Sequence, residues 1–373
     1  MKIVDISYHS SHWGLSTSEY LKISQPNIGY ASQLPNNYTT SFVFHSKNSE
    51  TIVIDEVTYI FKQKSTNSKI RFPFRLSSEI RKLQPDAILV HSLTYLHFAA
   101  FLRLFLPKKI IILVQHHGEL PTTHPLKKKI IQWSDHFIDG YLFTAKSLGL
   151  QWVHQKLISS PSKIFEVMEG SSHFKYQEEI ASPDVVELGK KELTTFLWVG
   201  RLDTNKDPIC TLKAFRQYRD NGNHFRLYMF YHTTELLEEI SNFIKKNELQ
   251  DVVFLKGKIT HHQLEQWYNW ADYFILASHR EAGGYALCEA MACGCIPIVT
   301  HIPSFAYMVK DNYSGLLFEP GNSDDLYQKL KMTNGQDKTV WQHRVLETFN
   351  ERLSFQAIAN GIVFTIETLL AKK

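Results

Sequence analysis

Short apolar runs alternate with helix-forming segments along most of the chain. Runs of this kind, bounded by polar or turn residues, are typical of buried strands in a parallel sheet. They are KIVDISY, SFVFHS, TIVIDEVTYIF, DAILVHS and KIIILVQHHG in the first half, and FLWVG, FRLYMFY, VVFLKG, YFILAS and CIPIVT in the second. The rhythm predicts an α/β fold with doubly wound parallel sheets, whose ligands lie at the carboxyl ends of the strands.

The helices between these runs are less sharply bounded by the sequence. We expect helices over residues 77–83, 236–246, 262–270, 286–292 and 324–330, and two more near the end of the chain. Residues 9–26 are predicted as a long polar loop, and residues 27–34 as the first helix. Residues 51–61 read as one continuous strand.

A charged, irregular stretch divides the chain. Residues 175–191 are rich in charge and carry Pro183 near their middle, which is typical of an interdomain linker. With 373 residues, 43% of them apolar and 13% aromatic, the chain can form two full cores and is not disordered as a whole. We therefore predict one domain over residues 1–180 and a second over residues 192–345.

The net charge of +4 is too small to indicate a nucleic-acid partner. Residues 1–190 carry 21 basic and 16 acidic side chains, whereas the remainder carries 20 and 21. This difference favours an anionic acceptor or an anionic membrane surface for the first half, although an ordinary solvated surface accounts for it equally well. The candidate membrane contacts are residues 127–129, three lysines before IIQW, and residues 101–109, where cations stand among leucines and phenylalanines.

All four cysteines fall in the second half of the chain, as Cys210, Cys288, Cys293 and Cys295. Their spacing fits neither a zinc site nor a secreted disulfide scaffold, so we expect core thiols in a reducing compartment. The first residues lack the apolar segment of a signal peptide, and no apolar run reaches the roughly 18 residues of a membrane span. The sequence therefore predicts a cytoplasmic protein that does not cross a membrane.

Residues 278–300 combine two glycines with two glutamates. Gly283 and Gly284 come at the turn from the strand YFILAS into a helix. Free backbone N–H groups and the positive end of the helix dipole would form a seat for an anion there, most naturally phosphate. Glu281 and Glu289 flank the turn, and carboxylates repel phosphate but accept hydrogen bonds from hydroxyl groups strongly. Polyols on both sides of a diphosphate describe a nucleotide sugar.

A second candidate site follows the strand FLWVG. Gly200 and Arg201 end this strand, and Lys206 stands five positions beyond the arginine. An arginine and a lysine on one loop can converge on one anion, and they suit a leaving diphosphate because arginine offers a planar fork of donors and lysine a point charge. A solvated basic loop is the ordinary interpretation of such a pair. The glutamate stretch downstream favours the functional one.

Together these motifs resemble the donor site of the retaining glycosyltransferases of family 4, which have the two-domain GT-B fold. The resemblance rests on Glu281, a small residue, Gly-Gly, four residues and Glu-Ala-Met-Ala-Cys-Gly before a proline-containing strand, and on Gly200-Arg201-Leu with Lys206. It implies two Rossmann-like domains that face a central cleft, the first binding the acceptor and the second the donor. It also implies that the last helix, residues 354–373, packs back on the first domain.

The resemblance assigns roles residue by residue. The catalytic set that it implies is His117, Glu281, Arg201 and Lys206. The donor-binding set is Gly200, Gly283, Gly284, Tyr285, Glu289 and Lys258. On the acceptor side it implies Gly14 and His116. In this interpretation Glu281 orients the sugar and is not a nucleophile.

Two segments depart from the family pattern. Relatives carry a Gly-Gly pair after the first strand, where this chain has only Gly14. They also carry a glycine-rich turn where this chain has residues 231–235, YHTTE. The acceptor side and the base side of the site are therefore expected to differ from the usual form.

The resemblance implies transfer of a sugar from a nucleotide-diphosphate sugar to a hydroxyl group of a saccharide or a lipid-linked saccharide. Configuration would be retained, as in the synthesis of cell-surface polysaccharide or lipopolysaccharide. Cationic side chains and the helix start would stabilise the leaving phosphate without a metal or a cofactor. Such an enzyme would work in the cytoplasm, peripherally on the inner face of the membrane.

Two other functions are compatible with the same motifs. A nucleotide-sugar 2-epimerase of the same fold would bind the same donor and convert it without an acceptor. A non-catalytic relative would bind carbohydrate alone, although the intact set of Arg201, Lys206, Glu281 and Glu289 argues against it.

Overall fold

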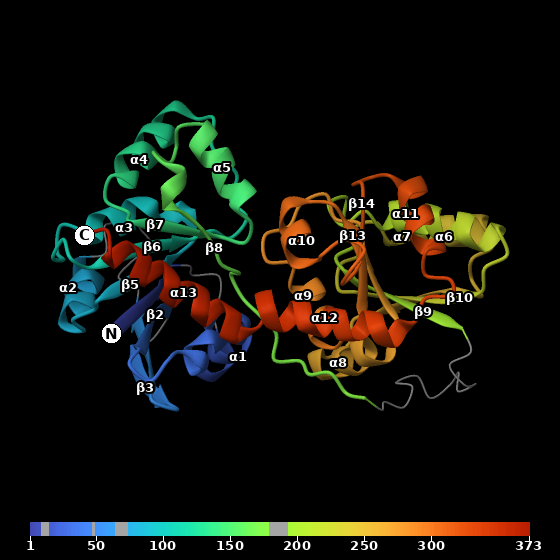
Figure 1. Cartoon of the computed structure of the whole chain (residues 1–373), viewed down its shortest axis with the longest axis horizontal. Helices are drawn as coiled ribbons and strands as arrows, with labels where there is room; N and C mark the ends of the chain where they lie inside the picture. The colour runs from blue at the N-terminus through green and yellow to red at the C-terminus, as the bar shows by residue number, and fades with distance from the viewer. Residues whose placement is uncertain (9–14, 47–48, 64–73, 179–192) are drawn as a thin grey trace. The chain divides into compact units, whose positions relative to one another are not determined.

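The computed structural model describes residues 1–8, 15–46, 49–63, 74–178 and 193–373. They form two compact units, residues 1–171 with 355–373, and residues 172–354 (Figure 1). Residues 172–178 and 346–354, which the predicted domain limits left outside the second domain, thus belong to the second unit. Gly14 and most of the predicted linker lie outside the described residues.

The first unit contains an eight-stranded sheet in the order β3-β4-β2-β1-β5-β6-β7-β8. Its strands are β1 (Lys2–Ser7), β2 (Thr39–Ser46), β3 (Glu50–Ile54), β4 (Val57–Gln63), β5 (Ala87–His91), β6 (Ile111–Gln115), β7 (Gly140–Phe143) and β8 (Ile164–Glu166). Neighbours pair in parallel except β3 and β4. The single strand predicted over residues 51–61 is wrong, because Asp55 and Glu56 have φ of 48° and 65° and turn the chain back. Two central residues with positive φ are typical of a type I′ hairpin.

The first helix, α1 (Thr17–Ile28), begins well before the predicted start at residue 27. Ser16 and Glu19 form a capping box: the Ser16 hydroxyl accepts from the Glu19 N–H at 3.4 Å, and the Glu19 carboxylate accepts from the Ser16 N–H at 2.8 Å. Reciprocal capping satisfies two backbone donors that a helix start otherwise leaves open. The predicted polar loop is therefore wrong from Thr17 onward, and a short 3-10 turn, η1 (Gly29–Gln33), occupies most of the predicted helix.

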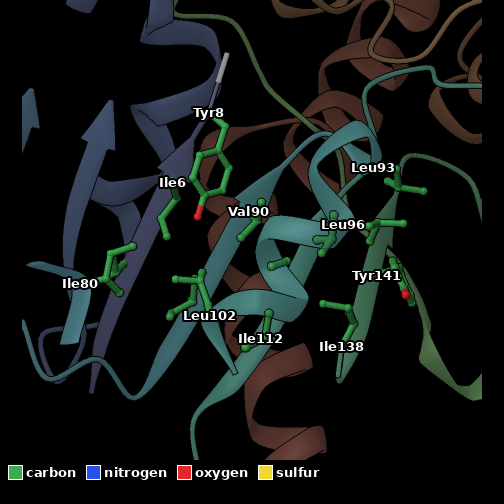
Figure 2. Packing of buried hydrophobic residues seen from close by; sticks show 14 of the residues in the cluster. Ile6, Tyr8, Ile80, Val90, Leu93, Leu96, Leu102, Ile112, Ile138 and Tyr141 are labelled. Atoms are coloured by element: carbon green, nitrogen blue, oxygen red, sulfur yellow. The ribbon is translucent and has the colours of Figure 1, made fainter. Parts of the chain in front are cut away.

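Helices pack on the first sheet and complete its core. They are α2 (Phe74–Lys82), α3 (Leu96–Leu102), α4 (Pro125–Asp135), α5 (Lys146–His154) and α13 (Phe355–Leu370). Figure 2 shows part of this core, in which Ile6, Val90 and Ile112 of three neighbouring strands lie beneath Leu96 and Leu102 of α3. Burial of apolar surface, at about 25 cal/mol per Å², holds the central strands together and positions their carboxyl ends.

The stretch Lys338–Leu370 is, by length and composition alone, long and apolar enough to cross a membrane. In the structure it forms two helices, α12 (Lys338–Arg352) and α13, which belong to different units. α13 buries Ile358, Ile362 and Ile366 in the first unit, and its Glu367 accepts a hydrogen bond from the Tyr38 hydroxyl at 3.0 Å. Its apolar residues thus contribute to the core of the first unit.

The second unit contains a six-stranded, fully parallel sheet in the order β11-β10-β9-β12-β13-β14. The strands are β9 (Thr194–Gly200), β10 (Phe225–Tyr231), β11 (Val253–Gly257), β12 (Tyr273–Leu276), β13 (Ile296–Thr300) and β14 (Leu316–Phe318). The helices, with α12, are α6 (Pro208–Asp220), α7 (Leu237–Lys246), α8 (His261–Trp270), α9 (Tyr285–Ala292), α10 (Pro303–Met308) and α11 (Ser323–Lys331).

The strand order reverses once in each sheet. The second sheet runs outward from β9 through β10 to β11 and then continues on the other side of β9 with β12. The first sheet reverses in the same way between β1 and β5. Ligands of doubly wound sheets bind outside the carboxyl ends of the strands at such switch points. The predicted fold class is confirmed, and the β3–β4 hairpin is the antiparallel exception among the described strands.

Candidate functional site

The loops that follow β9 and β12 meet at the switch point of the second unit. The His279 N–H donates to the carbonyl of Asn205 at 2.8 Å, and the Asn205 side chain donates to the carbonyl of Arg280 at 3.0 Å. The Lys206 ammonium forms an ion pair with Glu281. These contacts bring together two predicted residues that belong to separate motifs, Lys206 and Glu281.

Lys206 is held at its backbone as well as at its ammonium group. Its N–H donates to Asp203 Oδ1 at 2.9 Å, and its side chain is only 14% exposed, as is that of Glu281. Because a lysine ammonium has three N–H donors, the pair with Glu281 leaves donors for a further oxygen. The arrangement suits an anionic ligand oxygen next to Lys206.

Asp207 fixes the shape of the same loop. It caps α6 with a left-handed backbone (φ 43°), its Oδ1 accepts from the Cys210 N–H at 3.0 Å, and its Oδ2 lies 3.0 Å from His279 Nε2. A non-glycine residue adopts this conformation where its surroundings over-determine it. The loop that carries Lys206 is therefore held both from α6 and from the loop after β12.

Arg201 lies on this loop but pairs with a different carboxylate from Lys206. Its Nε lies 3.1 Å from Asp203 Oδ2, and its side chain is 53% exposed. Asp203 thus contacts both cationic residues, through one oxygen each. A Cβ on the preceding Gly200 would lie 3.1 Å from the Trp198 ring, so the backbone passes close to that ring.

The start of α9 offers backbone donors next to Glu281. Gly284 has φ 55° and provides no side-chain cap at the start of α9, and a helix start of this kind is suited to binding an anion. A Cβ on Gly284 would lie 2.9 Å from the Phe305 ring. The Ser304 hydroxyl donates to the carbonyl of Glu281 at 3.1 Å and fixes the approach to the turn, while Tyr285, the first helical residue, is exposed. Gly283 beside it is buried.

Glu289, in the second turn of α9, pairs with a residue that the sequence reasoning missed. Its Oε1 lies 2.7 Å from Nε2 of His261, the first residue of α8, whose ring lies 4.4 Å from that of Phe174. His261 follows closely after the carboxyl end of the predicted strand VVFLKG, where ligands of such sheets bind, and this position could have marked it as a candidate site residue. Lys258 is exposed in the turn between β11 and α8, directly after Gly257, which has φ 67°.

In the first unit, the predicted His117 belongs to a row of polar residues along the carboxyl edge of the sheet. Asp5 Oδ1 on β1 lies 2.9 Å from Nε2 of His91, the last residue of β5. His91 Nδ1 lies 2.7 Å from His117 Nε2, and His117 Nδ1 pairs with Glu169, which follows β8. The Tyr30 hydroxyl donates to the other Asp5 oxygen at 2.7 Å. We call these five residues the histidine row.

The neighbouring residues His116 and His117 are in different electrostatic environments. Burial acts to lower the pKa of His117, but the carboxylates of Glu169, Glu119 and Asp5 outweigh it, so that the pKa is raised. Burial lowers the pKa of His116, whose Nε2 lies 2.9 Å from the carbonyl oxygen of Glu119. His117 is therefore favoured as the cation and His116 as the neutral ring.

The predicted residues fall in three places. The loops at the second switch point carry Gly200, Arg201, Lys206, Glu281, Gly283, Gly284 and Tyr285, and the α8–α9 side of the same unit carries Lys258 and Glu289. The first unit carries His116 and His117, and Gly14 lies outside the described residues. The roles of all these residues stay predictions.

The second unit contains the segment that matches a known family. Residues 184–333 match the family model described as Glycosyl transferases group 1. GDP-mannose:cellobiosyl-diphosphopolyprenol alpha-mannosyltransferase from Xanthomonas oryzae is 31% identical over 124 residues, which cover 33% of this chain and 33% of that protein. The chain thus matches about a third of the length of such curated relatives.

Solved structures resemble the chain over nearly its whole length. A glycosyltransferase from Rickettsia africae has a TM-score of 0.72 at 15% identity and covers 100% of this chain and 99% of its own. HepE from Anabaena, solved in complex with UDP, has a TM-score of 0.72 at 14% identity, with coverage of 99% and 100%. The fold of the chain is therefore that of the GT-B glycosyltransferases.

Proposed function

We propose that this protein is a retaining glycosyltransferase of family 4. It would move a sugar from a nucleotide-diphosphate sugar to a hydroxyl group of a saccharide or a lipid-linked saccharide. The observation that carries the proposal is the Lys206–Glu281 pair at the second switch point, next to the uncapped start of α9. Both residues lie inside the segment that matches the family model.

The chemistry of sugar transfer fits the charges of this site. When the bond between the sugar and the diphosphate breaks, negative charge develops on the phosphate oxygens. Lys206, Arg201 and the positive end of the α9 dipole supply positive charge for it, and preorganised charge of this kind is usually the largest contribution to catalysis. Glu281 and Glu289 would accept hydrogen bonds from hydroxyl groups on the two sides of the diphosphate. These groups stabilise the leaving diphosphate without a metal ion.

Retention requires no protein nucleophile in this proposal. The acceptor oxygen attacks the anomeric carbon on the face that the phosphate leaves, and the departing phosphate oxygen takes the acceptor's proton. Glu281 suits an orienting role, because its carboxylate is already engaged with Lys206.

The comparisons suggest donor and acceptor classes for this proposal. The Xanthomonas relative is named for GDP-mannose and a diphosphopolyprenol-linked acceptor, and the Anabaena structure contains UDP. A lipid-linked acceptor would place the enzyme at the cytoplasmic face of a membrane. On α4, Leu126, Ile130 and Trp133 are 63%, 41% and 48% exposed and stand beside the lysines at 127–129, which supports docking on an anionic surface.

Thermal stabilisation by a panel of nucleotide sugars tests the donor site. The stabilising donor is then incubated with candidate acceptors in excess chelator, and NMR determines the anomeric configuration of the product. We expect transfer with retention that survives the chelator. Loss of activity that magnesium restores would contradict the metal-free donor site, and conversion of the nucleotide sugar without any acceptor would favour an epimerase.

A further inference from the structure

The histidine row contains four ring nitrogens between two carboxylates. His91 Nε2 faces Asp5, His117 Nδ1 faces Glu169, and the other two nitrogens face each other at 2.7 Å. Asp5 Oδ1 and Glu169 Oε2 are buried, and apart from their ion-pair contacts with the two imidazoles they have no hydrogen-bond partner among the described residues. Each of these oxygens therefore depends on the imidazole beside it.

Two neutral rings cannot satisfy these contacts. Two neutral imidazoles carry two N–H groups, whereas the row has three contacts that each need a proton between two lone-pair atoms. If the rings donate to both carboxylates, the two lone pairs of His91 Nδ1 and His117 Nε2 face each other at 2.7 Å. If one ring donates to the other instead, a nitrogen lone pair faces a buried carboxylate. A third ring proton removes the repulsion in either case.

We propose that His91 and His117 share this third proton, so that the pair is a single cation held between Asp5 and Glu169. In that state both ring nitrogens of His117 are engaged, and its ring can neither accept the acceptor's proton nor give one to the departing phosphate. His91 is then a positioning residue for His117. The role in catalysis rests on the proposed function, because it deepens the account of where the acceptor's proton goes.

The charged and titratable groups around the row agree with a cation at this place. Among the described residues, the groups that face His117 or its partners are Asp5 from β1, Tyr20 from α1, Tyr30 from η1, His91 from β5, His116 and Glu119 from the loop after β6, and Glu169 after β8. Three of them are carboxylates, and the Glu119 carboxylate also accepts a hydrogen bond from the backbone N–H of His117 at 2.8 Å. His116 opposes the charge, but its own pKa is lowered by burial.

Ring-nitrogen NMR of the full chain, labelled with 15N-histidine, tests the shared proton without any need for activity. At pH 7.5 we expect both ring nitrogens of His117 to be protonated or proton-sharing, with scalar coupling to His91 Nδ1 across the hydrogen bond. His116 is the internal control and should carry one protonated nitrogen. His91→Asn should abolish the coupling, and if that variant does not fold, through-bond correlations assign the wild-type signals. One proton on each of the two rings at pH 7.5 would overturn the proposal.

The dependence of kcat on pH tests the consequence for catalysis. A rise and a fall of kcat with increasing pH distinguish His117 as a base from the shared cation. If His117 were the base, kcat would rise as pH increases through its titration. The shared cation predicts that kcat is flat and then falls, because loss of the third proton sets the two ring nitrogens against each other.

Glu169→Gln should move that fall to lower pH, because it removes the carboxylate that most strongly raises the pKa of His117. Glu166→Gln is the matched control, since this carboxylate on the same segment accepts from the Lys146 N–H instead. A rising limb, or a profile that Glu169→Gln leaves unchanged, would overturn the role in catalysis. A chain that transfers no sugar but shows the coupling would refute the proposed function and leave the shared proton standing.

Discussion

At the scale of single residues, the proposed donor site is expected to depend most on the charge of Lys206. Lys206→Ala should lower kcat by roughly 100-fold, as removal of one group that stabilises transition-state charge often does. Steady-state kinetics measure the effect, and circular dichroism checks that the fold survives. Lys213→Ala, an exposed lysine on α6, is the control. Unchanged turnover in both Lys206→Ala and Arg201→Ala would remove the phosphate-binding role from this loop.

Gly284 offers a second prediction at this scale, because replacing it with alanine should destabilise the fold in two ways, through the backbone and through a steric contact. Alanine in the left-handed region costs about 1–2 kcal/mol, and at Gly284 the new Cβ would also lie 2.9 Å from the Phe305 ring. Gly222 has φ 79° and open space around it, so Gly222→Ala isolates the backbone cost. Urea denaturation should show a larger loss of unfolding free energy for Gly284→Ala. Equal losses would mean that Phe305 moves aside without cost.

At the scale of elements, α4 carries its charges at the unfavourable end. Lysines 127–129 stand in or next to the first turn, where the helix dipole disfavours cations. They therefore do not serve the stability of the helix, which supports a role at a surface. Beside them, the exposed Leu126, Ile130 and Trp133 recur every three or four residues and so lie along one side of α4.

Vesicle co-sedimentation tests this face of α4. Each cation near an anionic bilayer contributes about 1 kcal/mol, so the chain should bind anionic vesicles more tightly than neutral ones and lose most of that binding in added salt. The triple change to glutamate at residues 127–129 should abolish the preference. Because glutamate favours a helix start, lost binding would not reflect an unfolded helix. Equal binding to neutral and anionic vesicles would refute the docking.

At the scale of the whole molecule, the sequence predicts the second unit better than the first. The second switch point is built from two loops whose motifs are local, so the sequence marks Lys206 and Glu281 as candidates, and the structure pairs them; their roles stay predictions. The capping box at Ser16 and Glu19 and the hairpin turn at Asp55 were also local signals. The prediction missed both because it followed the pattern of apolar residues alone. The histidine row could not be predicted in this way, because its residues are far apart in the sequence and come together only through the strand order of the folded sheet. Of its members, only His117 had a motif to mark it.

α13 gives a prediction at the same scale, because it completes the first unit from the far end of the sequence. Ile366 is fully buried, and Ile366→Ala should cost about 2–5 kcal/mol. Hydrogen exchange should show the loss of protection in the strands of the first sheet and not in those of the second. Phe364→Ala, on the exposed side of the same helix, is the control. Equal loss of protection in both sheets would mean that the two units unfold together.

The late position of α13 also orders events during synthesis. The ribosome makes residues 1–171, then the whole of residues 172–354, and only then the helix that completes the first unit. At about 5–20 residues per second, the intervening stretch takes roughly 10–40 seconds. Throughout that interval the nascent first sheet lacks the apolar side chains of α13, whereas by the end of it the second unit has all of its own strands and helices. The unit made first is therefore expected to mature last and to leave part of its apolar surface uncovered in the meantime.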